Sequence, residues 1–289
     1  MSLILKIAGI SKQAYWQYKL KQLENKINAD DILLKAEAIR EEHPKIGIRK
    51  LYCMLQPSYI GRDKFETILI NNGFRVKYPR NYIRTTYSSK CYQYTNLIKG
   101  IELTDVNQVW NSDITYFWAR DKFYYLIFIQ DTYSRKIVGY QGSNNMRVEA
   151  NIKALKMAFK TRCNKNLRGL IHHSDMGTQY ASNLYTELLN NQNCLISMCK
   201  TAYENPYAER LNGIIKNEYL KSRQINNLRD LTKELDRAVY SYNNSRPHLS
   251  LINKLSPVTF ENYILSLPAE KRPRFKLYTD GQKQEVNNV

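Results

Sequence analysis

The sequence lacks the features that mark membrane-spanning and secreted proteins. Its longest aliphatic and aromatic run, Phe123–Ile129, has seven residues, whereas a helix needs roughly 20 apolar residues to cross a bilayer. The first ten residues carry Lys6 inside a short apolar stretch and offer no small-residue cleavage site, so they are not typical of a secretory signal. We therefore expect a cytoplasmic protein without a membrane span.

Cysteine pairs, glycine-rich nucleotide motifs and heptad repeats are missing as well. The five cysteines form no C-x-x-C pair, and no histidine lies beside paired cysteines, which argues against a structural zinc site and for reduced thiols. Neither G-x-x-x-x-G-K nor G-x-G-x-x-G occurs, so nothing indicates a bound nucleotide cofactor. The chain also shows no sustained heptads of the kind that predict a coiled coil.

Acidic residues are scarce beside basic ones. The chain has 44 Lys and Arg against 26 Asp and Glu, a formal net charge of +18, which favours a polyanionic partner, with nucleic acid as the first candidate. Much of the excess lies in the first 100 residues, with 18 basic and 8 acidic side chains. Six basic residues, five tyrosines and no acid fall within 71–100, so we interpret residues 79–104 as a basic, tyrosine-rich linker.

The residues before this linker favour helices. Ser11 can cap a helix within an N-terminal junction of residues 1–28, and Asp30 can cap a second helix after it. Two short amphipathic segments follow at 47–55 and 63–72.

We interpret residues 29–78 as a small, helix-turn-helix-like DNA-binding domain. Its candidate DNA contacts are basic side chains of the two short segments, namely Arg49, Lys50, Arg62 and Lys64. The alternative is a helical bundle that only packs against its neighbour.

The pattern changes to strands after the linker. Runs rich in β-branched and aromatic residues at 113–118, 123–131 and 136–143 predict an antiparallel meander. A helix at 149–162 and then a strand, a helix and a strand within 167–199 continue as an α/β alternation. This order predicts an α/β fold with an RNase H-like mixed sheet flanked by helices, preceded by the small all-helical domain.

The rest of the chain predicts helix and then little regular structure. The α/β core should occupy residues 105–222, and residues 223–267 should form its C-terminal helical extension. The amphipathic stretch 231–244 is expected to be the last regular element. Residues 268–289 are expected to be a mobile basic tail.

Three carboxylates lie at positions where they could act in catalysis. Asp113 opens the first strand, and Asp175 closes a buried strand just before Gly177. A helix start at Asn205-Pro206 places Glu209 in the first helical turn. Three clustered carboxylates suit two Mg²⁺ ions, with Mn²⁺ as a substitute, acting on a phosphodiester. By spacing alone, each acid could equally be a cap or a surface ion pair.

Several other residues have competing interpretations. His172 and His173 alternate along a strand, so packing or a supporting role behind the metal ligands is favoured over direct metal binding. Asp131 at the end of the second strand is interpreted as a turn cap, with a fourth metal-site acid as the alternative. Cys194 and Cys199 lie in an apolar run and are interpreted as core residues.

Helical spacing separates the residues that follow Glu209. Lys216 lies seven residues later, about two turns, so it shares the face of Glu209 and could contact DNA. The alternative for Lys216 is a solvated helix face. Glu218 lies nine residues later on the opposite face, so its replacement is expected to be nearly neutral, whereas Glu204 belongs to the loop before the helix.

Several segments, read in order, resemble a known family. WNSDITYFW, LIHHSDMGTQYAS and YAERLNGIIK resemble the catalytic core of insertion-sequence-three family transposases, which is similar to that of retroviral integrases and carries a DDE triad. Asp113, Asp175 and Glu209 match the triad. The stretch REEHPKIGIRKLYCML resembles the helix-turn-helix-like segment before that core. The 33 residues between Asp175 and Glu209 are two fewer than is usual, and the shortfall lies in the loop TAYENPY.

The resemblance implies a DNA transposase that nicks the ends of its element with water and joins the freed 3′-hydroxyl to target DNA. Two Mg²⁺ ions, double-stranded DNA with terminal repeats, target DNA and a homo-oligomer on DNA are implied partners. The resemblance also implies a second-reading-frame product, fused to or associated with an upstream-frame protein and located at the bacterial nucleoid. The alternatives are an RNase H-like nuclease without strand transfer and a DNA-binding regulator with a spent catalytic core.

Overall fold

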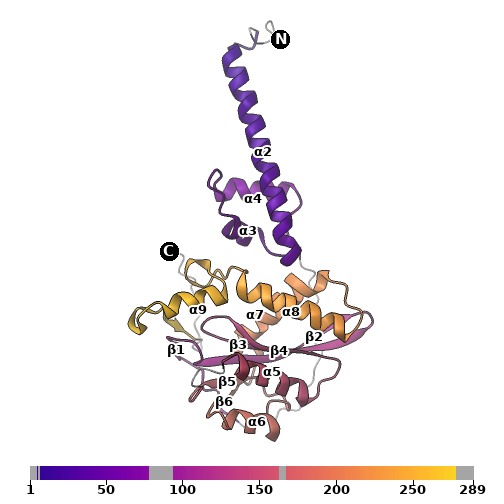
Figure 1. Cartoon of the computed structure of the whole chain (residues 1–289), viewed down its shortest axis with the longest axis vertical. Coiled ribbons are helices and arrows are strands. Elements are labelled where there is room, and N and C mark those ends of the chain that lie inside the picture. The colour runs from indigo at the N-terminus through magenta and orange to yellow at the C-terminus, as the bar shows by residue number, and fades with distance from the viewer. Residues whose placement is uncertain (1–4, 6, 78–93, 163–166, 278–289) are drawn as a thin grey trace. The chain divides into compact units, whose positions relative to one another are not determined.

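The computed structural model describes residues 5, 7–77, 94–162 and 167–277. The chain divides into two compact units, residues 1–77 and 78–289 (Figure 1), and each is described here by itself. Most of the expected linker, residues 79–93, lies outside the described residues.

The first unit is built on one long helix. α2 (Lys12–Glu42) packs against α3 (Ile48–Leu55) and α4 (Arg62–Asn71) around a core formed by Ile32, Ala36, Ile46, Leu51, Phe65, Leu69 and Phe74. Although α2 has 31 residues, no helix in the described part of the chain is apolar enough over a sufficient length to cross a membrane.

Only one of the two predicted caps begins a helix. The Ser11 hydroxyl accepts a hydrogen bond from the Ala14 backbone N–H at 3.0 Å, as predicted. The predicted cap at Asp30 is wrong, because α2 continues through it. Residues 28–30 contain neither glycine nor proline, so nothing there interrupts the backbone hydrogen bonds.

The second unit contains a five-stranded mixed sheet in the order β4-β3-β2-β5-β6. β2 (Val109–Ala119), β3 (Lys122–Asp131) and β4 (Ile137–Ser143) form the predicted antiparallel meander. β5 (Ile171–Ser174) runs parallel to β2, and β6 (Leu195–Met198) runs parallel to β5. The predicted RNase H-like strand arrangement is confirmed.

Helices cover both faces of this sheet (Figure 1). α5 (Val148–Thr161) and α6 (Asn183–Asn190) pack on one face, in a core that includes Trp110. α7 (Pro206–Ile214) and α8 (Leu228–Asn244) pack on the other, in a core that includes Phe117. Because side chains alternate along a strand, the odd-numbered residues of β2 face α7 and α8.

The C-terminal region is more regular than expected. α9 (Pro257–Leu265) follows α8, so residues 231–244 do not contain the last regular element. Ser256 caps α9, and proline occupies its first turn, a start signal that sequence reasoning passed over. β7 (Phe275–Lys276) pairs with β1 (Glu102–Leu103). The tail is therefore structured up to residue 277, because Phe275 and Leu277 pack in a hydrophobic cluster; residues 278–289 lie outside the described part.

Candidate active site

The parallel pairing of β2 and β5 brings two of the predicted carboxylates together. Asn111 of β2 lies opposite His173 of β5. Asp113 lies two residues further along β2, and Asp175 lies two residues beyond His173, close enough for its charge to act on Asp113. Asp113 is partly buried, and Asp175, just beyond the end of β5, is exposed. The Gly177 backbone N–H donates to Asp175 Oδ1 at 3.1 Å and orients that carboxylate.

α7 is anchored to β2 beside Asp113. The Asn205 side chain caps no backbone group of the helix; its Nδ2 donates to the Ser112 carbonyl oxygen at 3.0 Å. One turn beyond Glu209, Asn212 Nδ2 donates to Asp113 Oδ2 at 2.7 Å. Glu209 itself is exposed in the first turn of α7, as predicted. Sequence reasoning missed Asn212, although its position three residues after Glu209 places both on one helix face.

The two aspartates repel one another electrostatically. Burial, followed by the negative charge of Asp175, raises the pKa of Asp113 to about 7, against the opposing effects of the Ile114 backbone N–H, Lys216 and Asn212. Burial also raises the pKa of Asp175, although the hydrogen bond from Gly177 opposes the rise. Two carboxylates that repel one another are stabilised by a bound cation or by a proton shared between them.

Lys216, a candidate DNA contact from the sequence, lies close enough to Asp113 for its positive charge to act on that carboxylate. It lies in a π-helical turn, Ile215–Tyr219, that continues α7, and its Nζ donates to Thr115 Oγ1 at 2.7 Å. Burial lowers the pKa of Lys216, while the charges of Asp113 and Glu209 oppose that change. Lys216 is thus coupled to carboxylates of both β2 and α7.

Glu218 is turned away from the aspartates, as helix phase predicted. It is buried, and its carboxylate receives two hydrogen bonds from Arg246, at 2.8 and 2.9 Å. This ion pair alters the expectation that a Glu218 substitution is nearly neutral, because removing one member of a buried pair leaves the other charge uncompensated.

Glu204 holds the loop that leads into α7. Its carboxylate accepts hydrogen bonds from the backbone N–H groups of Lys200 and Thr201, at 2.6 and 3.3 Å. It also pairs with Lys99 at 3.1 Å. These contacts fix the position of Glu204 in the loop just before α7.

The two adjacent histidines have structural contacts. His172 Nε2 lies 3.0 Å from the Tyr185 hydroxyl, and His173 Nδ1 lies 2.8 Å from Ser197 Oγ. Burial lowers the pKa of His172 to about 3 and that of His173 to about 4. Both rings are therefore neutral at pH 7, and the packing interpretation is confirmed. Cys194 and Cys199 are buried, as expected for core residues.

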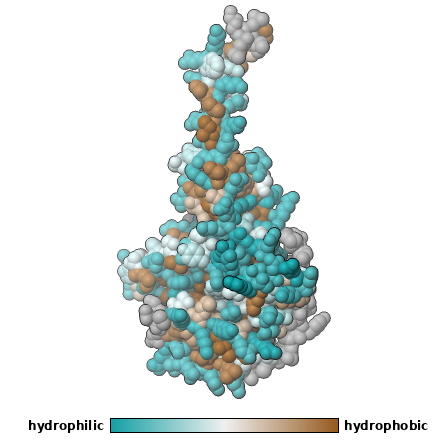
Figure 2. All heavy atoms as spheres, turned by 45° about the vertical axis from the view of Figure 1, so that its right-hand side comes forward, coloured by the Kyte–Doolittle hydropathy of each residue, from teal (hydrophilic) through white to brown (hydrophobic). Residues whose placement is uncertain are grey.

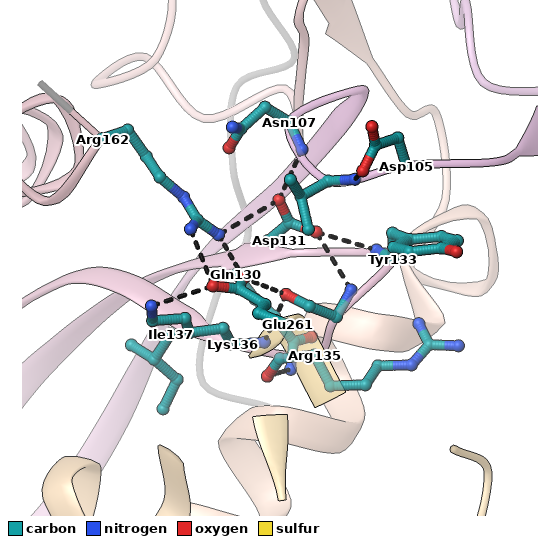
Figure 3. A network of polar contacts seen from close by, with 12 residues as sticks. Asp105, Asn107, Gln130, Asp131, Tyr133, Arg135, Lys136, Ile137, Arg162 and Glu261 are labelled. Carbon is teal, nitrogen blue, oxygen red and sulfur yellow. Dashed lines mark hydrogen bonds and ion pairs between the residues drawn. The ribbon is translucent and has the colours of Figure 1, made fainter. Parts of the chain in front are cut away.

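Asp131 belongs to a separate polar network (Figure 3). Its Oδ1 accepts hydrogen bonds from the backbone N–H groups of Tyr133 and Ser134, at 3.0 and 3.1 Å. The predicted turn cap is therefore confirmed. Its Oδ2 accepts the Asn107 backbone N–H at 2.7 Å and lies 3.5 Å from Arg162, so Asp131 already has compensating partners.

A divalent cation would find suitable donors at the Asp113 site. Throughout residues 5, 7–77, 94–162 and 167–277, no three His, Cys, Asp or Glu side chains gather closely enough to hold a common metal ion. Asp113 and Asp175 nevertheless offer hard oxygen donors with unrelieved like charge, which is the chemistry that Mg²⁺ prefers. The exposed Glu209 is the acid on α7 that could join them.

The predicted DNA contacts of the first unit lie on α3 and α4. Arg49 is 75% exposed and lies 3.5 Å from Glu66, and Arg62 contacts Asp63 at 2.9 Å. Lys64 Nζ donates to Asn25 Oδ1 of α2 at 3.0 Å. Lys50 lies on α3. The contact of these four residues with DNA stays a prediction.

A mixed sheet with Asp113 on β2, Asp175 just beyond the parallel strand β5 and Glu209 on α7 is the arrangement expected of a polynucleotidyl transferase of the DDE class. The family described as Integrase core domain matches residues 104–203, and a second family of that description matches residues 193–257. Together they include all three acids.

Insertion-sequence proteins are similar along most of the chain. The insertion element IS600 31 kDa protein of Shigella sonnei is 28% identical over 88% of this chain and 96% of its own length. The IS904 transposase of Lactococcus lactis is 31% identical over 68% and 76%, and transposase InsF of IS3A from Escherichia coli is 30% identical over 67% and 68%. The chain belongs to the insertion-sequence-three family of DNA transposases, whose members act on DNA.

Among solved structures, the HTLV-2 integrase catalytic core domain aligns with 54% of this chain and 97% of its own, at 20% identity and a TM-score of 0.43.

Proposed function

We propose that this transposase cleaves the ends of its own element and joins the freed 3′-hydroxyl to target DNA at a site formed by Asp113, Asp175 and Glu209. The observation that supports the proposal is the electrostatic coupling of Asp113 on β2 to Asp175, just beyond the neighbouring parallel strand β5. Their mutual repulsion is not cancelled within the fold, which is typical of a site that binds a cation.

Two in-line displacements make up the reaction. In the first, a water oxygen attacks the phosphorus at the element end, the bond to the 3′ oxygen breaks, and that oxygen takes a proton. In the second, this 3′-hydroxyl attacks a target phosphorus, loses its proton, and expels a 3′ oxygen of the target strand. No covalent bond to the protein is formed.

Each side chain of the site has a separate role in the proposed reaction. Asp113, Asp175 and Glu209 would hold two Mg²⁺ ions, or Mn²⁺, which when bound activate the attacking oxygen and stabilise the leaving one. Asn212 fixes the Asp113 carboxylate from α7. Lys216, on the same side as Asp113, would hold a DNA phosphate by charge.

The first unit would recognise the element ends through Arg49, Lys50, Arg62 and Lys64. Exposed guanidinium and ammonium groups contribute to DNA affinity mainly by displacing counterions from phosphates. Replacing Arg49 and Lys64 with glutamine should reduce both the end affinity and its dependence on salt. If the dependence of end affinity on salt is unchanged, the first unit does not take part in recognising the element ends. Two copies on paired ends, with fusion to an upstream-frame product, complete the proposed assembly.

The test compares Asp113→Asn and Asp175→Asn with Asp121→Asn, which alters an exposed aspartate in the β2–β3 turn. Both site variants should lose about a thousandfold or more of cleavage and joining, the equivalent of several kcal/mol, yet bind end DNA in a gel shift as the wild type does. Asp121→Asn should remain active. A site variant that still joins strands would refute the proposal, and a wild type that only hydrolyses would make the protein a nuclease.

A further inference from the structure

The second unit buries polar side chains close to the proposed site. Hydrophilic (teal) side chains cover much of the face of this unit that Figure 2 shows. His173 of β5 and Ser197 of β6 are instead completely buried. Burying a polar side chain costs free energy unless its polar groups find partners. The partners of these two residues therefore show what their burial achieves.

His173 lies in a row of residues that crosses the sheet. It is in register with Asn111 of β2 on one side and with Ser197 of β6 on the other. Residues in register on parallel strands point to the same face of a sheet, so His173 shares the α7 face with Asn111. Asp175 follows His173 by two residues, just beyond the end of β5. His173 is therefore on the strand that leads into one of the two aspartates.

The hydrogen bonds of the His173 ring run in one direction. Nε2 lies 3.2 Å from the Glu204 carbonyl oxygen, and a carbonyl oxygen only accepts, so Nε2 donates. Nδ1 lies 2.8 Å from Ser197 Oγ, and because the ring is neutral, Nδ1 accepts from the Ser197 hydroxyl. Ser197 Oγ in turn accepts the Leu97 backbone N–H at 2.9 Å. Both ring nitrogens therefore have protein partners.

Glu204 connects this chain of hydrogen bonds to α7. It lies two residues before the first residue of the helix, with its carbonyl bonded to His173 and its carboxylate paired with Lys99 at 3.1 Å. Glu209 follows five residues later, and its backbone N–H donates to the Asn205 carbonyl oxygen at 3.2 Å. Less than two helical turns separate Glu204 from Glu209. The position of Glu204 therefore constrains that of Glu209.

We infer that His173 is a positioning residue, which ties the start of α7, with Glu209, to β5, the strand that leads into Asp175. The inference rests on the proposed function, because it concerns how two of the three acids that would hold the metal ions are kept in place. Groups that orient metal ligands typically contribute about 10- to 100-fold in metal affinity. His173 would act through Asp175 and Glu209 and would not bind the metal itself.

Two amide replacements of His173 test the bond to Glu204. A glutamine amide reaches the position of Nε2 and donates to the carbonyl oxygen, whereas an asparagine amide, one methylene shorter, reaches only the position of Nδ1. Calorimetric titration of the full chain with Mn²⁺ measures metal binding apart from activity. His173→Asn should weaken Mn²⁺ binding about tenfold, and His173→Gln should stay within about threefold of the wild type.

Strand transfer on a pre-nicked end separates positioning from a general loss of structure. For His173→Asn, the Mg²⁺ concentration that gives half-maximal joining should rise about tenfold. The rate at saturating Mg²⁺ should recover to within about threefold of the wild type, because the three acids are all present. A loss of folded protein would instead lower the rate at every Mg²⁺ concentration.

His172→Asn is the matched control. His172 is the adjacent buried histidine, but its Nε2 lies 3.0 Å from the Tyr185 hydroxyl of α6, on the other face of the sheet. This variant should bind Mn²⁺ as the wild type does, even where its stability is lower. Lys99→Gln alters a side chain that is 42% exposed, so it tests the same loop without a change in the core. It should weaken Mn²⁺ binding about threefold.

The outcomes distinguish this inference from the proposed function. Wild-type Mn²⁺ affinity in Lys99→Gln together with a folded His173→Asn would overturn the positioning role, and so would equal losses in His173→Asn and His173→Gln. Asp175→Asn should lose Mn²⁺ binding. If it does so while His173→Asn binds normally, only the positioning role is wrong. If Asp175→Asn binds Mn²⁺ as the wild type does, the proposed site is wrong, and the inference fails with it.

Discussion

Two aspartates on neighbouring strands of one sheet, the buried Asp131 and the partly buried Asp113, have different electrostatic surroundings. Asp131 of β3 receives three backbone N–H groups and lies beside Arg162, which is itself bonded to Glu261 (Figure 3). Asp113 of β2 receives the Asn212 amide and the Ile114 backbone N–H and is near Lys216, but it also faces the like charge of Asp175. Complete burial raises the pKa of Asp131, and Arg162 opposes that rise; for Asp113, the largest neighbouring charge adds to it.

The comparison distinguishes Asp131, whose charge is compensated within the fold, from Asp113, whose charge is not fully compensated. Burial by itself would raise the pKa of Glu261, but hydrogen bonds from Arg162 hold it below its ordinary value. The Asp131 network thereby ties α9 to the sheet with its charges matched. The Asp113 pair is left with excess negative charge, a state that costs stability and that a functional site can use.

The largest effect on stability is expected in the Asp131 network. Glu261→Ala removes the acceptor of Arg162, Lys136 and Ser134, and should lower the free energy of unfolding by about 3 to 5 kcal/mol. Urea unfolding measures this loss, with the exposed Glu270→Ala as the control. A loss below about 1 kcal/mol would show that the network contributes little to the fold.

A smaller loss is expected for Glu218→Gln. The amide keeps the size of the side chain but leaves the Arg246 charge uncompensated, so unfolding should become easier by about 2 to 3 kcal/mol. Strand transfer by the folded variant should continue, since Glu218 is bonded away from the aspartates. Unchanged stability would mean that the Glu218–Arg246 pair makes no net contribution to the free energy of unfolding.

Acid should destabilise the protein through His172. Its pKa is about 3 when folded and near the ordinary 6.5 when unfolded, so the unfolded chain binds more protons as the pH falls below 6.5. Stability from this group is complete above pH 6.5 and falls by up to about 1.4 kcal/mol per pH unit below it. His172→Gln should flatten the profile between pH 6.5 and 4 relative to wild type, whatever its absolute stability. Parallel profiles would exclude His172 as the cause.

The last effect has the opposite sign. Asp113→Asn removes a carboxylate whose ionisation is unfavourable in the fold, so at pH 8 the variant should unfold less readily than wild type, by up to about 4 kcal/mol if the whole rise of the pKa to about 7 is relieved. Below pH 4 the gain should vanish, because Asp113 is then protonated in both states. Thermal melting without divalent cations checks this. A variant less stable at pH 8 would contradict the comparison between Asp113 and Asp131.

The strands of the meander and the helical position of Glu209 could be predicted because both leave local marks. Runs rich in β-branched and aromatic residues predicted β2, β3 and β4, and the Asn205-Pro206 start placed Glu209 in the first turn of α7. The continuity of α2 through Asp30 could not be predicted, since a capping residue also fits inside a helix when tertiary packing favours it.

Contacts between residues far apart in the chain could not be predicted from the sequence either. Glu218 and Arg246 are 28 residues apart, and Asp131 and Glu261 are linked through Arg162 and Ser134. Such pairs carry no periodicity, so the sequence could not show that Asp131 is compensated and Asp113 is not.

Strand transfer by Glu209→Gln and Glu218→Gln, measured side by side with Mg²⁺ on one pre-nicked end substrate, tests the central claim most directly. Both changes replace a carboxylate with an amide on one continuous helical stretch, but Glu209 is exposed in α7, whereas Glu218 is buried and paired with Arg246. Glu209→Gln should lose joining while remaining folded and bound to the end, and Glu218→Gln should join strands at a temperature where it is folded. An active Glu209→Gln beside a folded but inactive Glu218→Gln would contradict the assignment of the third catalytic acid.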